Sequence, residues 1–177
     1  MWSGEPVDVR GSHYRVGRLA GVPRPIQRPG PPILVAGGGA RAMSVAARQA
    51  DIVGVHLRMH RDGRGEDWST GSMAATRQRV EGIRAASGDR FEHLELQMML
   101  MTVEITDDPH GAADRIGSSE GLDPSEVLDS PYRLIGTVEQ MMDALEQRRA
   151  SLGVSYFVVP GGCAAGLAPV VARLSGR

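Results

Sequence analysis

The sequence has 177 residues, 41% of them hydrophobic, and its 20 basic and 21 acidic residues give a formal net charge of -1. This length and composition support one globular domain with a core and exclude a disordered chain. The two signs of charge are interleaved, which argues against nucleic acid or an anionic membrane as a partner. Every basic residue is arginine, and lysine and asparagine are absent, so a Walker-type lysine and a Schiff-base lysine are excluded.

The predicted location rests on three absences in the sequence. Cys163 is the single cysteine, so no internal disulfide can form. No apolar stretch approaches the roughly 20 residues of a membrane span, and no signal-peptide pattern opens the chain. We therefore expect a cytoplasmic protein without a membrane partner.

The first 30 residues predict an extended arm. Apolar residues alternate on either side of Gly11-Ser12, which indicates a β-hairpin with a two-residue turn. A proline-rich connector follows and leads to the first buried strand. We place the arm at residues 1–30 and the main body at residues 31–177.

A buried strand, a glycine turn and a helix open the main body. Ile33–Ala36 is apolar without polar alternation, as in parallel strands that are buried on both faces. Gly37, Gly38 and Gly39 come next. A helix is then predicted from small and apolar residues at three- and four-residue spacing, namely Ala42, Met43, Ala46, Ala47 and Ala50. A second buried strand is predicted over 52–55.

The middle of the chain predicts a long polar, glycine-rich loop that runs from His56 to Gly71. Ser72 is suited to cap the following helix, and Gly88 to end it. Leu94–Ile105 predicts a third strand. Shorter helical segments are then expected at Pro109 and at the capped turn 123–126.

The last part predicts a capped helix, a fourth strand over Val154–Val159 and a final helix. Thr137 and Gln140 have capping-box spacing, and Gly153 ends the helix that they open. Four strand–helix units predict an α/β fold with a parallel sheet and right-handed crossovers. Their length of roughly 37 residues suits one half of an eight-fold barrel. The alternative is a complete, open, doubly wound sheet.

The glycine turn is the main candidate for a binding site. Gly37, Gly38 and Gly39 fit the first part of a dinucleotide fingerprint, but the acidic residue expected after the second strand is replaced by His56-Leu57-Arg58. The remaining interpretation is a phosphate held by backbone N–H groups at a helix N-terminus. The structural alternative is a tight turn from strand to helix.

Other chemistry has weaker support in the sequence. His56 and His60 lie at a strand end without the glutamate of a zinc helix, so no metal site is predicted. Cys163 follows the fourth strand but has no histidine nearby in sequence to activate it. Neither a nucleophile elbow nor a convincing pair of carboxylates is present.

Five segments of the chain carry a likeness to a known family: WSGEPVDVRGSHYRV, PRPIQRPGPP, PPILVAGGG, AARQADIVGV and SPYRLIGTVEQMMDALEQRRASLGVSYFVV. They resemble the C-terminal half of luciferase-like flavin or deazaflavin oxidoreductases, together with the segment just before that half. The resemblance implies a TIM-type barrel, of which parallel (β/α) units form the C-terminal half behind an N-terminal hairpin arm. It implies deazaflavin coenzyme F-420 as the cofactor, with flavin mononucleotide (FMN) as the alternative, for hydride transfer or monooxygenation.

The resemblance also implies roles for particular residues. Gly37, Gly38 and Gly39 match the family's glycine turn, which holds the phosphate-bearing tail of the cofactor. His56 stands where some relatives have a hydroxyl residue, and Gly161 and Gly162 would border the cofactor mouth. The four strands that supply the catalytic groups in the family have no counterpart here, so the catalytic residues are unknown.

We therefore expect a fragment, a split-gene product or a start placed too late at Met1, which is inactive alone and forms a homo-oligomer or a complex with an N-terminal half. The alternatives are a non-catalytic half-barrel that pairs with itself or another chain, and a small NADP-binding domain.

Overall fold

The computed structural model describes residues 2–176 and divides the chain into two compact units, with the boundary between Ile33 and Leu34. Within the described residues, no helix combines the length and the apolar character that crossing a membrane requires.

The first unit is built around a two-stranded antiparallel ribbon, β1 (Val7–Arg10) and β2 (Arg15–Leu19). Val9 lies opposite Val16 in this ribbon, and Arg10 lies opposite Arg15. The connection spans four residues, closed by a 2.9 Å hydrogen bond from Gly11 N to the Tyr14 carbonyl. The two-residue turn predicted at Gly11-Ser12 is therefore wrong: β1 ends directly before Gly11, but β2 begins two residues later than such a turn requires.

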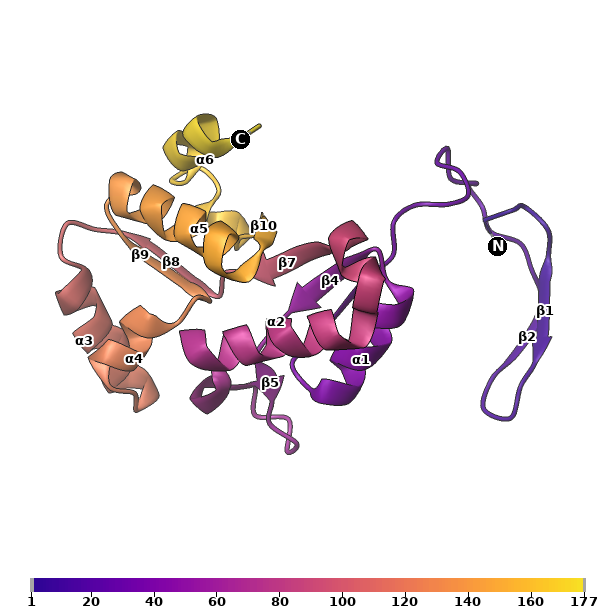
Figure 1. Cartoon of the computed structure of the whole chain (residues 1–177), viewed down its shortest axis with the longest axis horizontal. Coiled ribbons are helices and arrows are strands. Elements are labelled where there is room, and N and C mark those ends of the chain that lie inside the picture. The colour runs from indigo at the N-terminus through magenta and orange to yellow at the C-terminus, as the bar shows by residue number, and fades with distance from the viewer. Residues whose placement is uncertain (1, 177) are drawn as a thin grey trace. The chain divides into compact units, whose positions relative to one another are not determined.

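A four-stranded parallel sheet forms the centre of the second unit (Figure 1). Its strand order is β10-β7-β4-β3, so each strand lies beside the one that precedes it among the four, without a reversal. The central strands are the most deeply buried, with Val53, Val55 and Met98 fully enclosed. The four strands are β3 (Leu34–Gly37), β4 (Ile52–Val55), β7 (Glu95–Met99) and β10 (Val154–Val158).

Helices connect these strands, and successive helices contact one another: α1 with α2, α2 with α5, and α5 with α6. Their apolar stripes face the sheet, as Met43 and Ala46 of α1 and Val80 and Ile83 of α2 are buried. This arrangement confirms the helical periodicity predicted from the sequence. The helices are α1 (Ala40–Gln49), α2 (Met73–Ser87), α5 (Val138–Leu152) and α6 (Ala168–Leu174).

The apolar segment that predicts one long third strand forms two strands in different sheets. β7 ends at Met99, and β8 (Thr102–Ile105) pairs in parallel with β9 (Arg133–Gly136). At the break, Leu100 N donates to the Val158 carbonyl at 2.8 Å, whereas Met101 N donates to the Tyr132 carbonyl at 2.7 Å. The chain thus leaves one sheet and joins the other within two residues.

The sequence analysis missed β9 because its first residue carries a charge. Arg133 is only 3% exposed, since its guanidinium pairs with Glu120 and stacks 3.8 Å from the centre of the Trp68 ring. Both partners are distant in sequence, so no local pattern marks this arginine as buried. Two helices connect β8 to β9 and lie beside them, α3 (Pro109–Glu120) and α4 (Pro124–Asp129) (Figure 1).

The segment predicted as a polar loop contains a short antiparallel ribbon. β5 (Arg58–Met59) pairs with β6 (Glu66–Asp67), and a 3-10 turn over Trp68–Thr70 leads into α2. Further 3-10 turns lie at Gly88–His93 and Gly161–Cys163. The β5–β6 ribbon is important for the candidate site because it brings its side chains to the ends of β3 and β4.

Candidate functional site

The glycine turn joins β3 to α1 and leaves the start of α1 without a side-chain cap. Gly39 is the N-cap residue, and the first turn contains no acidic residue. The three longer helices, α2, α3 and α5, are capped by the side chains of Ser72, Asp108 and Thr137. The first N–H groups of α1 therefore lack the side-chain acceptor that those helices have, at the end where the helix dipole favours negative charge.

Gly38 and Gly39 have different surroundings. A Cβ atom at Gly38 would lie 2.1 Å from the Leu57 carbonyl oxygen and 2.5 Å from the Arg58 nitrogen. Only glycine allows the turn to approach this backbone so closely. A Cβ atom at Gly39 would meet nothing within 4 Å. Gly38 is therefore required by packing, whereas Gly39 faces open space.

A pocket of about 390 Å³, here called the basic pocket, opens between the glycine turn, α1 and α2. Two arginines and three hydroxyl residues line it, and its lining contains no carboxylate. An anion would find several donors and no repelling charge in the lining. The polar side chains that line this pocket are Ser44, Arg58, Ser69, Thr70, Gln78 and Arg79.

Hydrogen bonds fix the position of Arg79 in this pocket. Its guanidinium donates to the Tyr132 hydroxyl oxygen at 3.0 Å and also to the Thr70 carbonyl. The hydroxyl of Thr70 accepts from Arg58 N at 3.2 Å, which ties the start of β5 to the same network. Tyr132 is fully buried, and this burial raises the pKa of its phenol, so the hydroxyl stays protonated at neutral pH.

A second pocket of about 250 Å³, here called the mouth pocket, adjoins the other side of Gly38. It lies at the C-terminal ends of β3 and β4, with Met101 from beyond β7 also in its lining. His56, Glu66 and Tyr132 bring polar groups into an otherwise apolar lining. Burial lowers the pKa of His56, although the nearby Glu66 carboxylate acts in the opposite direction. The imidazole is therefore neutral at pH 7.

The structure brings together some of the predicted site residues. Gly37, Gly38 and His56 all line the mouth pocket, and His56 N donates to the Gly37 carbonyl at 3.1 Å. Gly161 and Gly162 lie in the 3-10 turn after β10 and line neither of the two pockets. The Cys163 thiol contacts the Val103 carbonyl at 3.8 Å. Within residues 2–176, no group of three or more His, Cys, Asp or Glu side chains is placed to hold a metal ion.

Sequence reasoning missed Arg79, Tyr132 and Glu66. Arg79 is one of several arginines on α2, and nothing local distinguishes it from Arg77 or Arg84. Tyr132 lies 53 residues farther along the chain and meets Arg79 only through the fold.

Comparison with known proteins gives a family. The family model for luciferase-like monooxygenase matches residues 1–103. No curated protein matches the sequence.

Solved structures with the same fold include monooxygenase RslO1 from Streptomyces bottropensis, with a TM-score of 0.64 and 19% identity over 97% of this chain and 55% of that one. An F420-dependent secondary alcohol dehydrogenase has a TM-score of 0.62 and 15% identity, covering 89% of this chain and 51% of that one. A coenzyme F420-dependent tetrahydromethanopterin reductase from Methanopyrus kandleri has a TM-score of 0.62 and 14% identity, covering 90% and 53%.

The chain therefore spans about half the length of these solved structures, and at such identities the likeness concerns the fold. The family itself is given by the model, which matches more than half of the sequence. The chain belongs to the luciferase-like monooxygenase family.

Proposed function

We propose that this chain holds the phosphate-bearing tail of deazaflavin coenzyme F-420, or of FMN in its place, in the basic pocket. The observation that carries the proposal is the uncapped start of α1, which opens on a pocket with two arginines and no carboxylate in its lining. Among the relatives, the dehydrogenase and the reductase are named for F420, and a riboflavin lyase structure contains a modified FMN. Both cofactors carry a phosphate group that this pocket suits.

The residues of the basic pocket fit an anion in charge and in geometry. The first N–H groups of α1 and the guanidinium of Arg58 are the donors, and a hydrogen bond to a charged group contributes about 1.5–3 kcal/mol. Arg79 is already held by Thr70 and Tyr132, so ordering it on binding costs little side-chain entropy. Gly38 and Ala40, on either side of Gly39, bring the start of α1 into the lining of this pocket.

The mouth pocket receives the part of the ligand that lies beyond the phosphate. A bound deazaflavin or flavin supplies hydride transfer or oxygen chemistry there. The neutral imidazole of His56 offers one donor and one acceptor, while Met101 and Leu57 exclude water from the pocket wall. Gly161 and Gly162 are assigned in this proposal to the rim of the cofactor mouth, as the resemblance implies.

We also propose that the second unit is the C-terminal half of a TIM-type barrel. The sheet order without a reversal supports this, because a doubly wound sheet reverses its strand order at a switch point. The edge strands β3 and β10 have no further neighbour in their sheet, and Leu34 and Tyr156 on them are 44% and 39% exposed. In this proposal the catalytic groups and the missing strand neighbours lie outside this sequence, and the protein acts in the cytoplasm.

The two alternatives have less support. A small NADP-binding domain could use Arg58 for the 2′-phosphate, but a doubly wound sheet holds its dinucleotide where the strand order reverses, and this sheet has no reversal. The luciferase-like family match also does not favour it. A non-catalytic half-barrel has no specific observation in its favour.

Paired ligands with and without phosphate test the proposal. We expect FMN to bind at least about tenfold more tightly than riboflavin, and F-420 more tightly than its deazaflavin without phosphate, because each charged contact adds affinity. Arg58→Ala should remove most of this difference, as measured by fluorescence titration. Arg64→Ala is the matched control, since Arg64 lies in the same ribbon and pairs with Asp62 on the surface. Equal affinities with and without phosphate would contradict the proposal.

A further inference from the structure

Two hydrogen bonds fix the guanidinium of Arg79 in the basic pocket. One N–H group donates to the Tyr132 hydroxyl oxygen at 3.0 Å, and another donates to the Thr70 carbonyl. An arginine side chain without such partners samples many rotamers and loses that freedom when it binds a ligand. The two acceptors therefore determine where the guanidinium lies before a ligand arrives.

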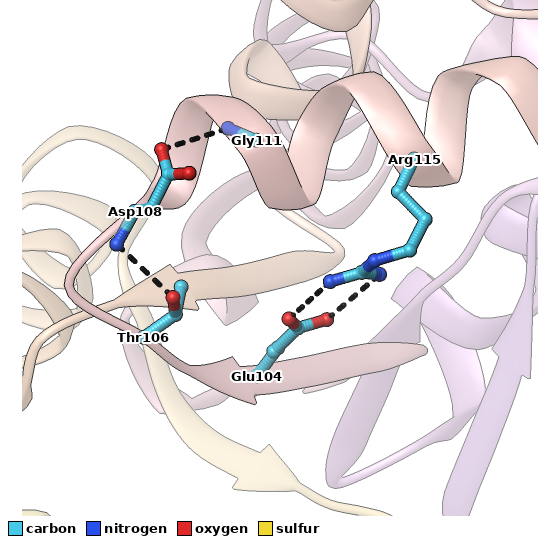
Figure 2. Close-up of polar contacts among 5 residues, drawn as sticks. All are labelled: Glu104, Thr106, Asp108, Gly111 and Arg115. Atoms are coloured by element: carbon cyan, nitrogen blue, oxygen red, sulfur yellow. Dashed lines mark hydrogen bonds and ion pairs between the residues drawn. The ribbon is translucent and has the colours of Figure 1, made fainter.

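Both acceptors are neutral, so no carboxylate compensates the positive charge of Arg79. Figure 2 shows the opposite arrangement at α3, where the two oxygens of Glu104 accept from the guanidinium of Arg115 at 2.6 and 3.5 Å. Arg79, by contrast, takes part in no ion pair among residues 2–176. A guanidinium has five N–H groups, so Arg79 keeps both its charge and further donors for an anion.

Tyr132 is itself held firmly and does not line the basic pocket. Its side chain is fully buried, and its carbonyl accepts from Met101 N at 2.7 Å, at the break between β7 and β8. Tyr132 belongs to the lining of the mouth pocket. Burial raises the pKa of its phenol, so the hydroxyl oxygen remains a neutral acceptor at pH 7. A fixed acceptor thus reaches Arg79 from the segment just before β9.

The same network reaches Arg58, the second arginine of the basic pocket. The carbonyl of Thr70 accepts from Arg79, and its hydroxyl oxygen accepts from Arg58 N at 3.2 Å. That hydroxyl also donates to the Asp67 carbonyl at 2.7 Å. The backbone that carries the Arg58 side chain is therefore bonded to the residue that holds Arg79. Hydrogen bonds connect both arginines of the pocket to Tyr132.

We propose that Tyr132 is a positioning residue of the basic pocket: from outside the pocket lining, its hydroxyl holds the Arg79 guanidinium where it meets the anionic group of the ligand. This inference rests on the proposed function and adds a residue that acts through Arg79. Its consequence is that the preference for a phosphate-bearing ligand depends on a hydroxyl that does not line the phosphate site.

Tyr132→Phe tests the inference, because phenylalanine keeps the ring in the mouth pocket and removes only the hydroxyl. Fluorescence titration of the full chain with FMN and with riboflavin isolates the contribution of the phosphate, since the two ligands differ by that group. We expect Tyr132→Phe to weaken FMN binding by at least about fivefold and to change riboflavin binding by less than about twofold. Calorimetric titration with inorganic phosphate should show the same loss as FMN.

Glu104→Gln is the matched control, because it weakens the hold on Arg115, an arginine that lines neither pocket. Both affinities should remain unchanged in this variant. Arg79→Gln gives a second comparison, since it should weaken FMN binding by removing the guanidinium itself. Adding Tyr132→Phe to Arg79→Gln should then have no further effect, because the hydroxyl no longer has a guanidinium to hold.

Several results would overturn the role of Tyr132. A preference for FMN that survives Tyr132→Phe would overturn it and leave the proposed function intact. Equal weakening of FMN and riboflavin would show that the hydroxyl serves only the stability of the fold. A further loss of FMN binding in the Arg79→Gln background would show that Tyr132 does not act through Arg79. Equal affinities for FMN and riboflavin in the unmodified chain would contradict the proposed function and this role with it.

Discussion

Gly38 and Gly39 are neighbours in sequence, yet their surroundings give them different structural roles. Gly38 lies against the backbone of Leu57 and Arg58, so its lack of a side chain is a packing requirement. Gly39 has open space around its Cβ position and an ordinary extended conformation, with φ -92° and ψ 147°. A family likeness assigns one role to the whole glycine run, whereas the geometry separates a structural glycine from one that is free to serve a ligand.

Substitutions at the two glycines should therefore have opposite effects: one should mainly lower stability, and the other should mainly weaken ligand binding. Gly38→Ala should lower the free energy of unfolding by about 2 kcal/mol, because a backbone must move to relieve the clash. Gly39→Val should leave stability within about 0.5 kcal/mol and, if the anion binds as proposed, weaken FMN or F-420 binding, since residue 39 is the N-cap residue of α1. Denaturant unfolding and ligand titration measure the two quantities. A loss of stability at Gly39 as large as that at Gly38 would show that the turn serves packing alone.

The half-buried His56 predicts a pH dependence of stability. Partial burial lowers its pKa in the folded state below the usual 6.5, so the unfolded chain binds the proton more readily. The stability that the neutral imidazole contributes is present above pH 6.5 and is lost as the pH falls through that value toward the folded pKa.

Unfolding by urea from about pH 8 to about pH 5 should show this loss in the unmodified protein. His56→Gln should flatten the profile over that range, because glutamine does not titrate. The exposed His13 provides the control, since His13→Gln should leave the profile unchanged. Parallel profiles for the unmodified protein and His56→Gln would contradict the assignment.

At the scale of elements, the sequence predicts best what depends on near neighbours in the chain. Ser72 accepts from Ala75 N, and Thr137 with Gln140 forms a capping box, as the spacing of these residues indicates. Gly153 ends α5 in a left-handed conformation, with φ 73°. Each of these interactions joins residues within a few positions of each other, so the local sequence is sufficient to predict it.

Strand boundaries set by distant pairing are harder to predict. Nothing near Leu100 and Met101 marks a break, because the acceptors that separate β7 from β8 are the carbonyls of Val158 and Tyr132. In the candidate site, too, contacts between distant residues could not be predicted from the sequence. The glycine turn and His56 are visible in sequence, whereas the link from Arg79 to Tyr132 exists only after α2 and the segment before β9 have met.

The cap of α5 gives a direct test at this scale. Thr137→Ala should lower the free energy of unfolding by about 1 kcal/mol, because Gln140 N loses its acceptor. Thr137→Ser keeps a hydroxyl at the same position and should retain most of the stability. Urea denaturation of the two variants makes the comparison. If alanine and serine gave equal values, the cap would not contribute.

At the scale of the whole molecule, the proposed half-barrel predicts an incomplete enzyme. We expect the isolated chain to show no oxidoreductase turnover with reduced FMN or F-420, since in this proposal the catalytic groups lie outside the sequence. The unpaired edges β3 and β10 should also lower its stability, because burying an apolar face contributes about 25 cal/mol per Å². Activity assays and thermal unfolding test this expectation. Turnover by a monomer that melts cooperatively would favour the complete open sheet instead.

The order of strands in the sheet also has a consequence for how the chain folds. Each strand pairs with the one that precedes it among β3, β4, β7 and β10, so the order in space is the order of synthesis. β3 and β4 can pair once residues 34–55 have left the ribosome, and each later strand then meets an edge that is already formed. Leu34 pairs with Ile52, so the first loop to close is short and its closure entropy is low, whereas the pairing of Leu96 with Val154 closes a much longer loop. In this order the sheet grows in one direction during translation, from β3 as the first edge to β10 as the last strand to join.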